Sequence, residues 1–170
     1  MGVTLEYRSF EELDAAALYE LLALRQEVFL LEQRCIYRDL DGLDRFACHL
    51  LAREEGRLVG CVRLLPAELC YDGYAAPSFG RLAVRSSCRG RGIGGELVRR
   101  ACGWLCRDGG EVRISAMAYL RGFYEELGFL PVSEVFWKEG VEHLTMQYRC
   151  PAGKTPRQDW QICTNFRSGS

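Results

Sequence analysis

Apolar residues recur along the chain with two different periods, and these periods predict its order of helices and strands. Val3 to Tyr7 alternates as in a first strand, and Ser9-Phe10-Glu11-Glu12 has the spacing of a capping box that starts a helix. The helical stripe that follows consists of Leu18, Leu21, Leu22, Arg25, Val28 and Phe29. Arg25 is the polar residue on this otherwise apolar stripe, which predicts a helix packed on a sheet.

The middle of the chain predicts consecutive strands. We expect them at residues 46–53, 57–65 and 78–84. Glu54-Glu55-Gly56 is typical of a tight turn between the first two of these strands. The preceding segment, 32–45, has no helical period and is rich in aspartate, which favours an irregular loop.

The second half of the chain alternates between helix and strand. The helix that follows residues 85–92 has an apolar face formed by Ile93, Leu97, Ala101, Trp104 and Leu105. A strand at 112–116, a short helix at 120–127 and a hairpin of 129–137 with 143–148 complete the pattern. The predicted order is β-α-β-β-β-α-β-α-β-β. It fits one domain over residues 1–150 and a mobile tail over 151–170.

Composition narrows the class of protein. The 170 residues carry 22 Lys and Arg against 23 Asp and Glu, a net charge of −1, so we expect no nucleic-acid partner. No apolar run reaches membrane-spanning length, so we expect no membrane partner either. The nine cysteines are odd in number and scattered, with no C-x-x-C pair. They predict reduced, unpaired thiols, no metal site and a cytoplasmic location.

A glycine-rich turn stands between the strand at 78–84 and the helix that follows. It consists of Arg89, Gly90, Arg91, Gly92, Ile93, Gly94 and Gly95. Glycines let the backbone approach a ligand closely, and a helix N-terminus adds partial positive charge. This combination predicts a site for an anion such as a pyrophosphate.

Three interpretations of this turn compete. Gly90, Gly92 and Gly95 match the dinucleotide fingerprint G-x-G-x-x-G, but the turn follows antiparallel strands rather than opening a βαβ unit. A loop without a ligand is unfavourable, because each glycine in a helix costs about 1 kcal/mol relative to alanine. Arg89-x-x-Gly92-x-Gly94 fits a third pattern, R/Q-x-x-G-x-G/A.

That third pattern resembles the coenzyme A pyrophosphate loop of the GNAT acetyltransferases. The segment Leu82-Ala83-Val84 resembles the fourth strand of that family, and 123–129, Phe-Tyr-Glu-Glu-Leu-Gly-Phe, resembles a later family motif. The resemblance implies an α/β GNAT fold: a mixed, strongly twisted sheet of about seven strands, flanked by helices and splayed between strands 4 and 5. It also implies acetyl-CoA as co-substrate, with the pantetheine arm paired along 82–84. Met117 stands where many members carry an amide.

The N-terminal half resembles the ElaA-like branch of the family. The similarity rests on Leu24-Arg25-x-x-Val28-Phe29-x-x-Glu32-Gln33, on the aspartate-rich segment 37–44, and on Gly140-Val141-x-His143-x-x-Met146. It covers residues 5 to 149 and implies an N-acetyltransferase. The acceptor amine is left open between a small molecule and a peptide, and a homodimer is left open as well.

Acetyl transfer to an amine needs a proton donor for the thiolate and a proton acceptor for the amine. The resemblance places Tyr124 beside the coenzyme sulfur, which makes it the candidate acid. Glu32, His49 and His143 are candidate bases, each also interpretable as a structural residue. No Ser-His-Asp or Cys-His set is evident, in agreement with direct transfer.

Two charged groups are candidates for binding the acceptor. Asp41 and Asp44, together with Asp39, have two interpretations: they form an acidic rim that binds a cationic amine, or they form a solvated turn without a ligand. Arg63 and Arg81, on neighbouring strands, clamp an acidic group of the acceptor or pair with Glu32 or the aspartates.

Two other functions compete with acetyl transfer. Arg25-x-x-Val28-Phe29, Asp41-x-x-Asp44 and 63–66 also resemble the acyl-homoserine lactone synthases, which use S-adenosylmethionine as acceptor. The chain lacks the tryptophan that follows the Val-Phe segment in that family. A non-catalytic acyl-CoA-binding sensor is the second alternative.

Overall fold

The computed structural model describes residues 2–69, 76–106 and 110–151. Its strands are β1 (Thr4–Ser9), β2 (Cys48–Glu54), β3 (Arg57–Leu65), β4 (Ser78–Val84), β5 (Glu111–Met117), β6 (Leu130–Pro131), β7 (Phe136–Lys138) and β8 (Val141–Arg149). Its α-helices are α1 (Ala15–Arg25), α2 (Ile93–Leu105) and α3 (Arg121–Glu126). A π-helical turn, Gln26–Glu32, extends α1.

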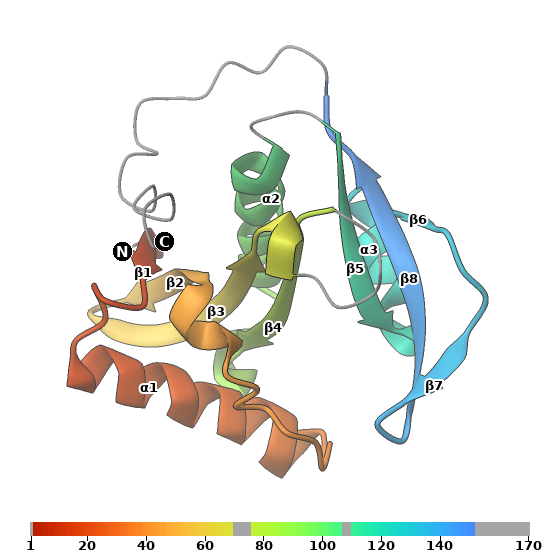
Figure 1. Cartoon of the computed structure of the whole chain (residues 1–170). Coiled ribbons are helices and arrows are strands. Elements are labelled where there is room, and N and C mark those ends of the chain that lie inside the picture. Colours follow the sequence, from red (N-terminus) through yellow and green to blue (C-terminus); the bar gives the residue numbers. More distant parts are fainter. Residues whose placement is uncertain (1, 70–75, 107–109, 152–170) are drawn as a thin grey trace.

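The strands form two sheets that meet at one point and then separate. The first has the order β1-β2-β3-β4, and in the second β8 pairs with β5, β6 and β7. The sheets touch where β4 and β5 begin, through a hydrogen bond of 3.1 Å from the Arg113 N–H to the Pro77 carbonyl. From there the two strands run in the same direction and diverge (Figure 1). The predicted splay between the fourth and fifth strands is thereby confirmed.

Helices α1 and α2 cover opposite faces of the first sheet (Figure 1). Alternate residues of a strand point to opposite faces. Leu51 of β2 accordingly packs with Leu21 and Leu24 of α1, whereas Leu50 packs with Leu97 of α2. All residues of the predicted apolar face of α2 are buried: Ile93, Leu97, Ala101, Trp104 and Leu105. Among the described residues, no helix is both long and apolar enough to cross a membrane.

Two predicted boundaries are wrong for local reasons. Ser9 and Glu12 do form a turn, in which the Glu12 carboxylate accepts from the Ser9 N–H at 2.7 Å. The helix begins later, because the Asp14 side chain caps it by accepting from the Ala17 N–H. The predicted strand 129–137 is split into β6 and β7, which raises the strand number from about seven to the eight described. The predicted tail, 151–170, lies beyond the described residues except for Pro151.

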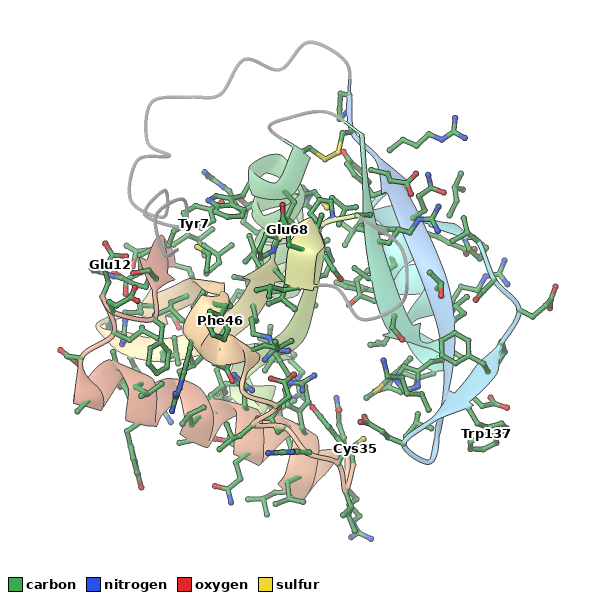
Figure 2. All side chains as sticks on the ribbon, viewed as in Figure 1. Tyr7, Glu12, Cys35, Phe46, Glu68 and Trp137 are labelled. Carbon is green, nitrogen blue, oxygen red and sulfur yellow. A yellow bond between two sulfur atoms is a disulfide. The ribbon has the colours of Figure 1, made fainter. Side chains whose placement is uncertain are left out.

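The prediction that every cysteine is unpaired is wrong. Cys106, at the end of α2, forms a disulfide with Cys150, just after β8 (Figure 2). Cys35, Cys61, Cys88 and Cys102 are free thiols. The paired cysteines are 44 residues apart, so their spacing carries no local signal. The bond ties the helix that follows the glycine-rich turn to the second sheet.

Candidate active site

A cleft of about 650 Å³ opens where the two sheets part. Its walls are formed by β4, β5, the segment after the π-helical turn, the β7–β8 hairpin and Tyr124 of α3. Figure 2 labels a residue near each side: Cys35, which lines the cleft, and Trp137, which points away and is 72% exposed. The cleft therefore lies between the segment after the π-helical turn and the β7–β8 hairpin.

The glycine-rich turn has the geometry of an anion cradle. Gly92 caps α2 with φ +80°, and Gly90 has φ +73°, backbone conformations that L side chains rarely adopt. A Cβ atom at either glycine would meet nothing within 4 Å, so the backbone here faces open space. The first bond of α2 runs from the Glu96 N–H to the Gly92 carbonyl, which leaves the earlier N–H groups for a ligand. These residues fit a bound pyrophosphate.

The arginines of the turn are engaged with carboxylates. Arg89 Nη2 lies 2.5 Å from Glu32 Oε2, and Arg91 Nη2 lies 2.5 Å from Glu54 Oε1. Both arginine side chains are nearly half exposed, and exposed ion pairs are weak. Either guanidinium can therefore exchange its carboxylate for a phosphate.

The three predicted pantetheine-binding residues occupy different environments. Leu82 lines the cleft, whereas Ala83 is buried against the α1 side of the sheet. The Val84 carbonyl accepts from Arg89 Nε at 2.9 Å. No ladder joins β4 to β5 in the described residues, so the edge of β4 that faces the gap is free for an added strand.

Tyr124 lies on the wall of the cleft, at the start of the gap between the sheets. It is 6% exposed, and its ring contacts Phe79, Phe123 and Phe129. Burial raises the pKa of Tyr124, and nearby Tyr119 and Cys102 act in the same direction. No described residue forms a hydrogen bond with its hydroxyl. The group therefore stays protonated at neutral pH and is available as an acid.

The three candidate bases are placed very differently. Glu32 pairs with Arg89 and does not line the cleft. His49 is 1% exposed, bonds the Asp44 carbonyl through Nε2 at 3.0 Å, and has its pKa lowered mainly by burial. His143 lines the cleft, and its Nδ1 lies 2.9 Å from the Val141 carbonyl. Because a carbonyl only accepts, Nδ1 carries the hydrogen, and in the neutral imidazole the lone pair is then on Nε2.

The acidic loop is paired with arginines. Arg63 holds Asp41 through two bonds of 2.7 Å, and the buried Arg25 holds Asp44 at 2.6 Å. Burial alone would raise the pKa of Asp41, but the bonds from Arg63 and Leu43 lower it to about 2. Pairing with the aspartates is one of the alternatives expected for Arg63 and Arg81, and the structure contains these ion pairs. Asp41 lines the cleft with its carboxylate already engaged, and Asp44 does not line it.

Arg81 belongs to the same ion-pair network. Its Nε lies 2.7 Å from Asp39 Oδ1, and its Nη2 lies 3.2 Å from Asp41 Oδ2. Arg63 and Arg81 both line the cleft, but their guanidinium groups are directed to aspartates of this chain. The network is balanced in charge, so it does not by itself attract an acidic acceptor.

Several cleft residues were not singled out by the sequence. They are Cys35, Arg38, Ser115, Lys138 and Glu139. None belongs to a motif; Arg38 lies in the loop without a helical period, Lys138 ends β7, and Glu139 begins the turn that follows. Across the described residues, no group of three or more His, Cys, Asp or Glu side chains is placed to hold a metal ion.

Comparison with known proteins identifies the class. A family model described as the acetyltransferase (GNAT) domain matches residues 18–150. The chain therefore belongs to the GNAT acetyltransferase family, and the predicted GNAT fold is confirmed. A crystal structure named acyl-CoA N-acyltransferase, from Pseudomonas aeruginosa, is 34% identical, with a TM-score of 0.77 over 86% of this chain and 99% of that chain.

Within the family, the relatives belong to the branch that the sequence predicts. Protein ElaA of Escherichia coli is 34% identical over 139 residues, which cover 79% of this chain and 89% of ElaA. Its crystal structure superposes with a TM-score of 0.77 over 87% of this chain. A UPF0039 protein of Synechocystis is 37% identical over 154 residues, 89% of this chain and 98% of the relative. The ElaA-like resemblance is confirmed.

The acyl-homoserine lactone synthases share the fold. The synthase BjaI, in a structure with S-adenosylmethionine and isopentyl-CoA, is 19% identical, with a TM-score of 0.73 over 89% of this chain and 85% of that chain. BjaI is named as CoA-dependent. Use of coenzyme A therefore does not distinguish this synthase from the acetyltransferases. The two functions differ in the acceptor of the acyl group.

Proposed function

We propose that this protein is an N-acetyltransferase that moves an acetyl group from acetyl-CoA directly to an amine. One observation carries the proposal: a Cβ atom at Gly94 of the glycine cradle would lie 3.7 Å from Val84, at the end of β4, and 3.7 Å from Phe123, the neighbour of Tyr124 in α3. The cradle suits the pyrophosphate, the free edge of β4 suits the pantetheine arm, and the cleft suits the thioester.

Each side chain has a definite part in this reaction. The amine nitrogen attacks the thioester carbonyl carbon, the carbon–sulfur bond breaks, and Tyr124 gives its proton to the departing sulfur. We assign the proton lost by the amine to Nε2 of His143, because His143 is the candidate base that lines the cleft. Proton exchange with solvent then reprotonates Tyr124 and removes the proton from His143. Glu32 and His49, the other candidates, lie outside the lining of the cleft.

The proposed acceptor is a small-molecule or peptide amine. Arg63, Arg81 and Asp41 line the wall nearest to it, with Arg38 and Lys138 as further cations. We place the enzyme in the cytoplasm, where its proposed donor substrate is made, and we leave homodimerisation as an untested expectation.

A lactone synthase and a non-catalytic sensor are the alternatives. Tyr124 and His143, the proposed acid and base, both line the cleft, and a sensor does not need them there. The synthase differs in its acceptor, S-adenosylmethionine, so binding of that compound separates the two functions.

The test is isothermal titration of the purified protein with acetyl-CoA, with NAD and S-adenosylmethionine as comparisons. We expect acetyl-CoA alone to bind. Gly92→Asp should abolish this binding, because the new side chain fills the cradle and repels phosphate. Gly103→Asp is the matched control, since Gly103 lies on α2 with open space around it. Unchanged affinity in Gly92→Asp would overturn the proposal, and binding of S-adenosylmethionine would favour the synthase.

A further inference from the structure

Arg81 has an unusual backbone conformation for a residue inside a strand. Its φ is +56°, a left-handed value that residues other than glycine rarely adopt. The pairing of β3 with β4 is irregular at the same place: Cys61 pairs with Ala83 and Arg63 with Gly80. Two residues of β4, Arg81 and Leu82, therefore stand opposite one residue of β3, which is a β-bulge.

The Arg81 side chain is anchored to the acidic loop at three points. Its guanidinium contacts the carboxylates of Asp39, at 2.7 Å, and Asp41, at 3.2 Å. It also lies over the ring of Tyr37, 5.0 Å from the centroid. Its side chain is 20% exposed. These contacts can hold a backbone conformation that arginine would not choose alone.

The anchor itself is fixed to the rest of the fold. The buried Arg25 of α1 binds Asp39 at 3.0 Å, and Arg63 of β3 binds Asp41. The Tyr37 hydroxyl donates to Asp39 at 3.2 Å. The loop that holds Arg81 is thus tied to a helix and to a neighbouring strand.

The bulge lies where it can affect the reaction. Arg81 and Leu82 belong to β4, the strand that has parted from β5. Both line the cleft, as do Met117 and Tyr124. Bulges beside active sites re-aim backbone and side-chain groups. A backbone N–H directed at a developing oxyanion stabilises acyl transfer strongly.

We propose that Arg81 is a positioning residue, whose left-handed backbone conformation, supported by its contacts with Tyr37, Asp39 and Asp41, holds the β4 bulge in the shape that the acyl-transfer step requires. This inference rests on the proposed function and adds a role for the ion-pair network. It differs from a clamp on the acceptor: a positioning residue acts through its backbone conformation, whereas a clamp acts through its charge.

Two substitutions separate these roles. Arg81→Asn and Arg81→Val both remove the guanidinium and have similar size. Asparagine tolerates the left-handed conformation, whereas a β-branched residue is a genuine outlier there. Arg53→Asn is the control for losing a partly buried arginine, because Arg53 is 18% exposed and pairs with Glu6 and Glu20, residues of β1 and α1.

The readouts are the acetyl-CoA dissociation constant and the rate of acetyl-CoA hydrolysis by water, which needs no identified acceptor. Free coenzyme A is separated by chromatography, because Cys35 and other free thiols would react with thiol reagents. We expect Arg81→Val to lose about 100-fold in kcat, the size of losing one oxyanion donor. The kcat of Arg81→Asn should stay within about tenfold of the wild-type value, and the kcat of Arg53→Asn should equal the wild-type value. The dissociation constant should stay constant throughout.

Equal loss of kcat in Arg81→Asn and Arg81→Val would overturn the inference in favour of a charge-based role. Full activity in both variants would overturn it as well. A wild type without turnover would instead count against the proposed function. The inference is then tested by the NMR chemical shift of the Leu82 backbone amide. This shift should change in Arg81→Val and stay near its wild-type value in Arg81→Asn. A reversed or equal response of the two variants would overturn the inference.

Discussion

The carboxylate of Glu32 lies 2.5 Å from the guanidinium of Arg89 and so ties the end of the π-helical turn to the glycine-rich turn. The same arginine donates from Nε to the Val84 carbonyl at 2.9 Å. π-Helical turns are frequent at functional sites. Here the turn brings a carboxylate to the glycine-rich turn rather than to the cleft.

Glu32→Gln should therefore leave acetyl transfer nearly intact. We expect kcat within about threefold of the wild type, because a residue outside the cleft takes no proton from the amine. The affinity for acetyl-CoA should rise, since Arg89 is released to face the pyrophosphate. Steady-state kinetics and titration with acetyl-CoA measure the two effects.

Two comparison variants make this result interpretable. Glu54→Gln releases Arg91 from the same turn and should raise affinity in the same way. His143→Gln should lower kcat by about 100-fold. If Glu32→Gln gave that loss instead, Glu32 would be the base.

Tyr124→Phe should lower kcat by about 100-fold and leave the dissociation constant of acetyl-CoA unchanged. The hydroxyl is lost while the ring keeps its contacts with Phe79 and Phe129. Because burial raises the pKa of Tyr124, wild-type activity should persist at alkaline pH. Tyr19→Phe is the control, since Tyr19 is 77% exposed on α1. Equal rates in Tyr124→Phe and the wild type would mean that Tyr124 is not the acid.

Much of the fold could be predicted because its signals are local. β3 and β4 have the predicted bounds, and the apolar face of α2 is read from side chains three and four residues apart. The glycine-rich turn is recognised for the same reason, since its residues are consecutive. Tyr124 is found through its place before the Gly128-Phe129 pair.

The remaining features depend on partners that are distant in sequence. Asp39 and Arg81 are 42 residues apart, and nothing local shows that the first holds the second. A left-handed arginine in a strand breaks the rule that reserves this conformation for glycine and asparagine. The sequence therefore allows Arg63 and Arg81 to pair with the aspartates as one alternative, but it does not show that this alternative is the one adopted.

Removal of the Cys106–Cys150 disulfide should destabilise the fold. For a sequence separation of 44 residues, the loss of chain restraint in the unfolded state corresponds to about 4 kcal/mol. Guanidinium unfolding of the wild type, with and without reductant, measures this difference. The double variant Cys106→Ser, Cys150→Ser should unfold at the midpoint of the reduced wild type and should not respond to reductant. A wild type indifferent to reductant would show that the bond contributes nothing.

The Asp41–Arg63 pair should make the free energy of unfolding depend on pH in the acidic range. The pKa of Asp41 is about 2 in the folded protein and about 3.9 in an unfolded chain, so its contribution is present above pH 4 and is lost as the pH falls toward 2. The shift corresponds to about 2 kcal/mol. Guanidinium unfolding at pH 7, 4 and 2.5 should show this loss, and Asp41→Asn should be less stable at pH 7 with a shallower dependence below pH 4. Glu125→Gln, which breaks an exposed pair with Arg121, should keep the wild-type slope. An equal slope in Asp41→Asn would mean that other carboxylates carry the acid sensitivity.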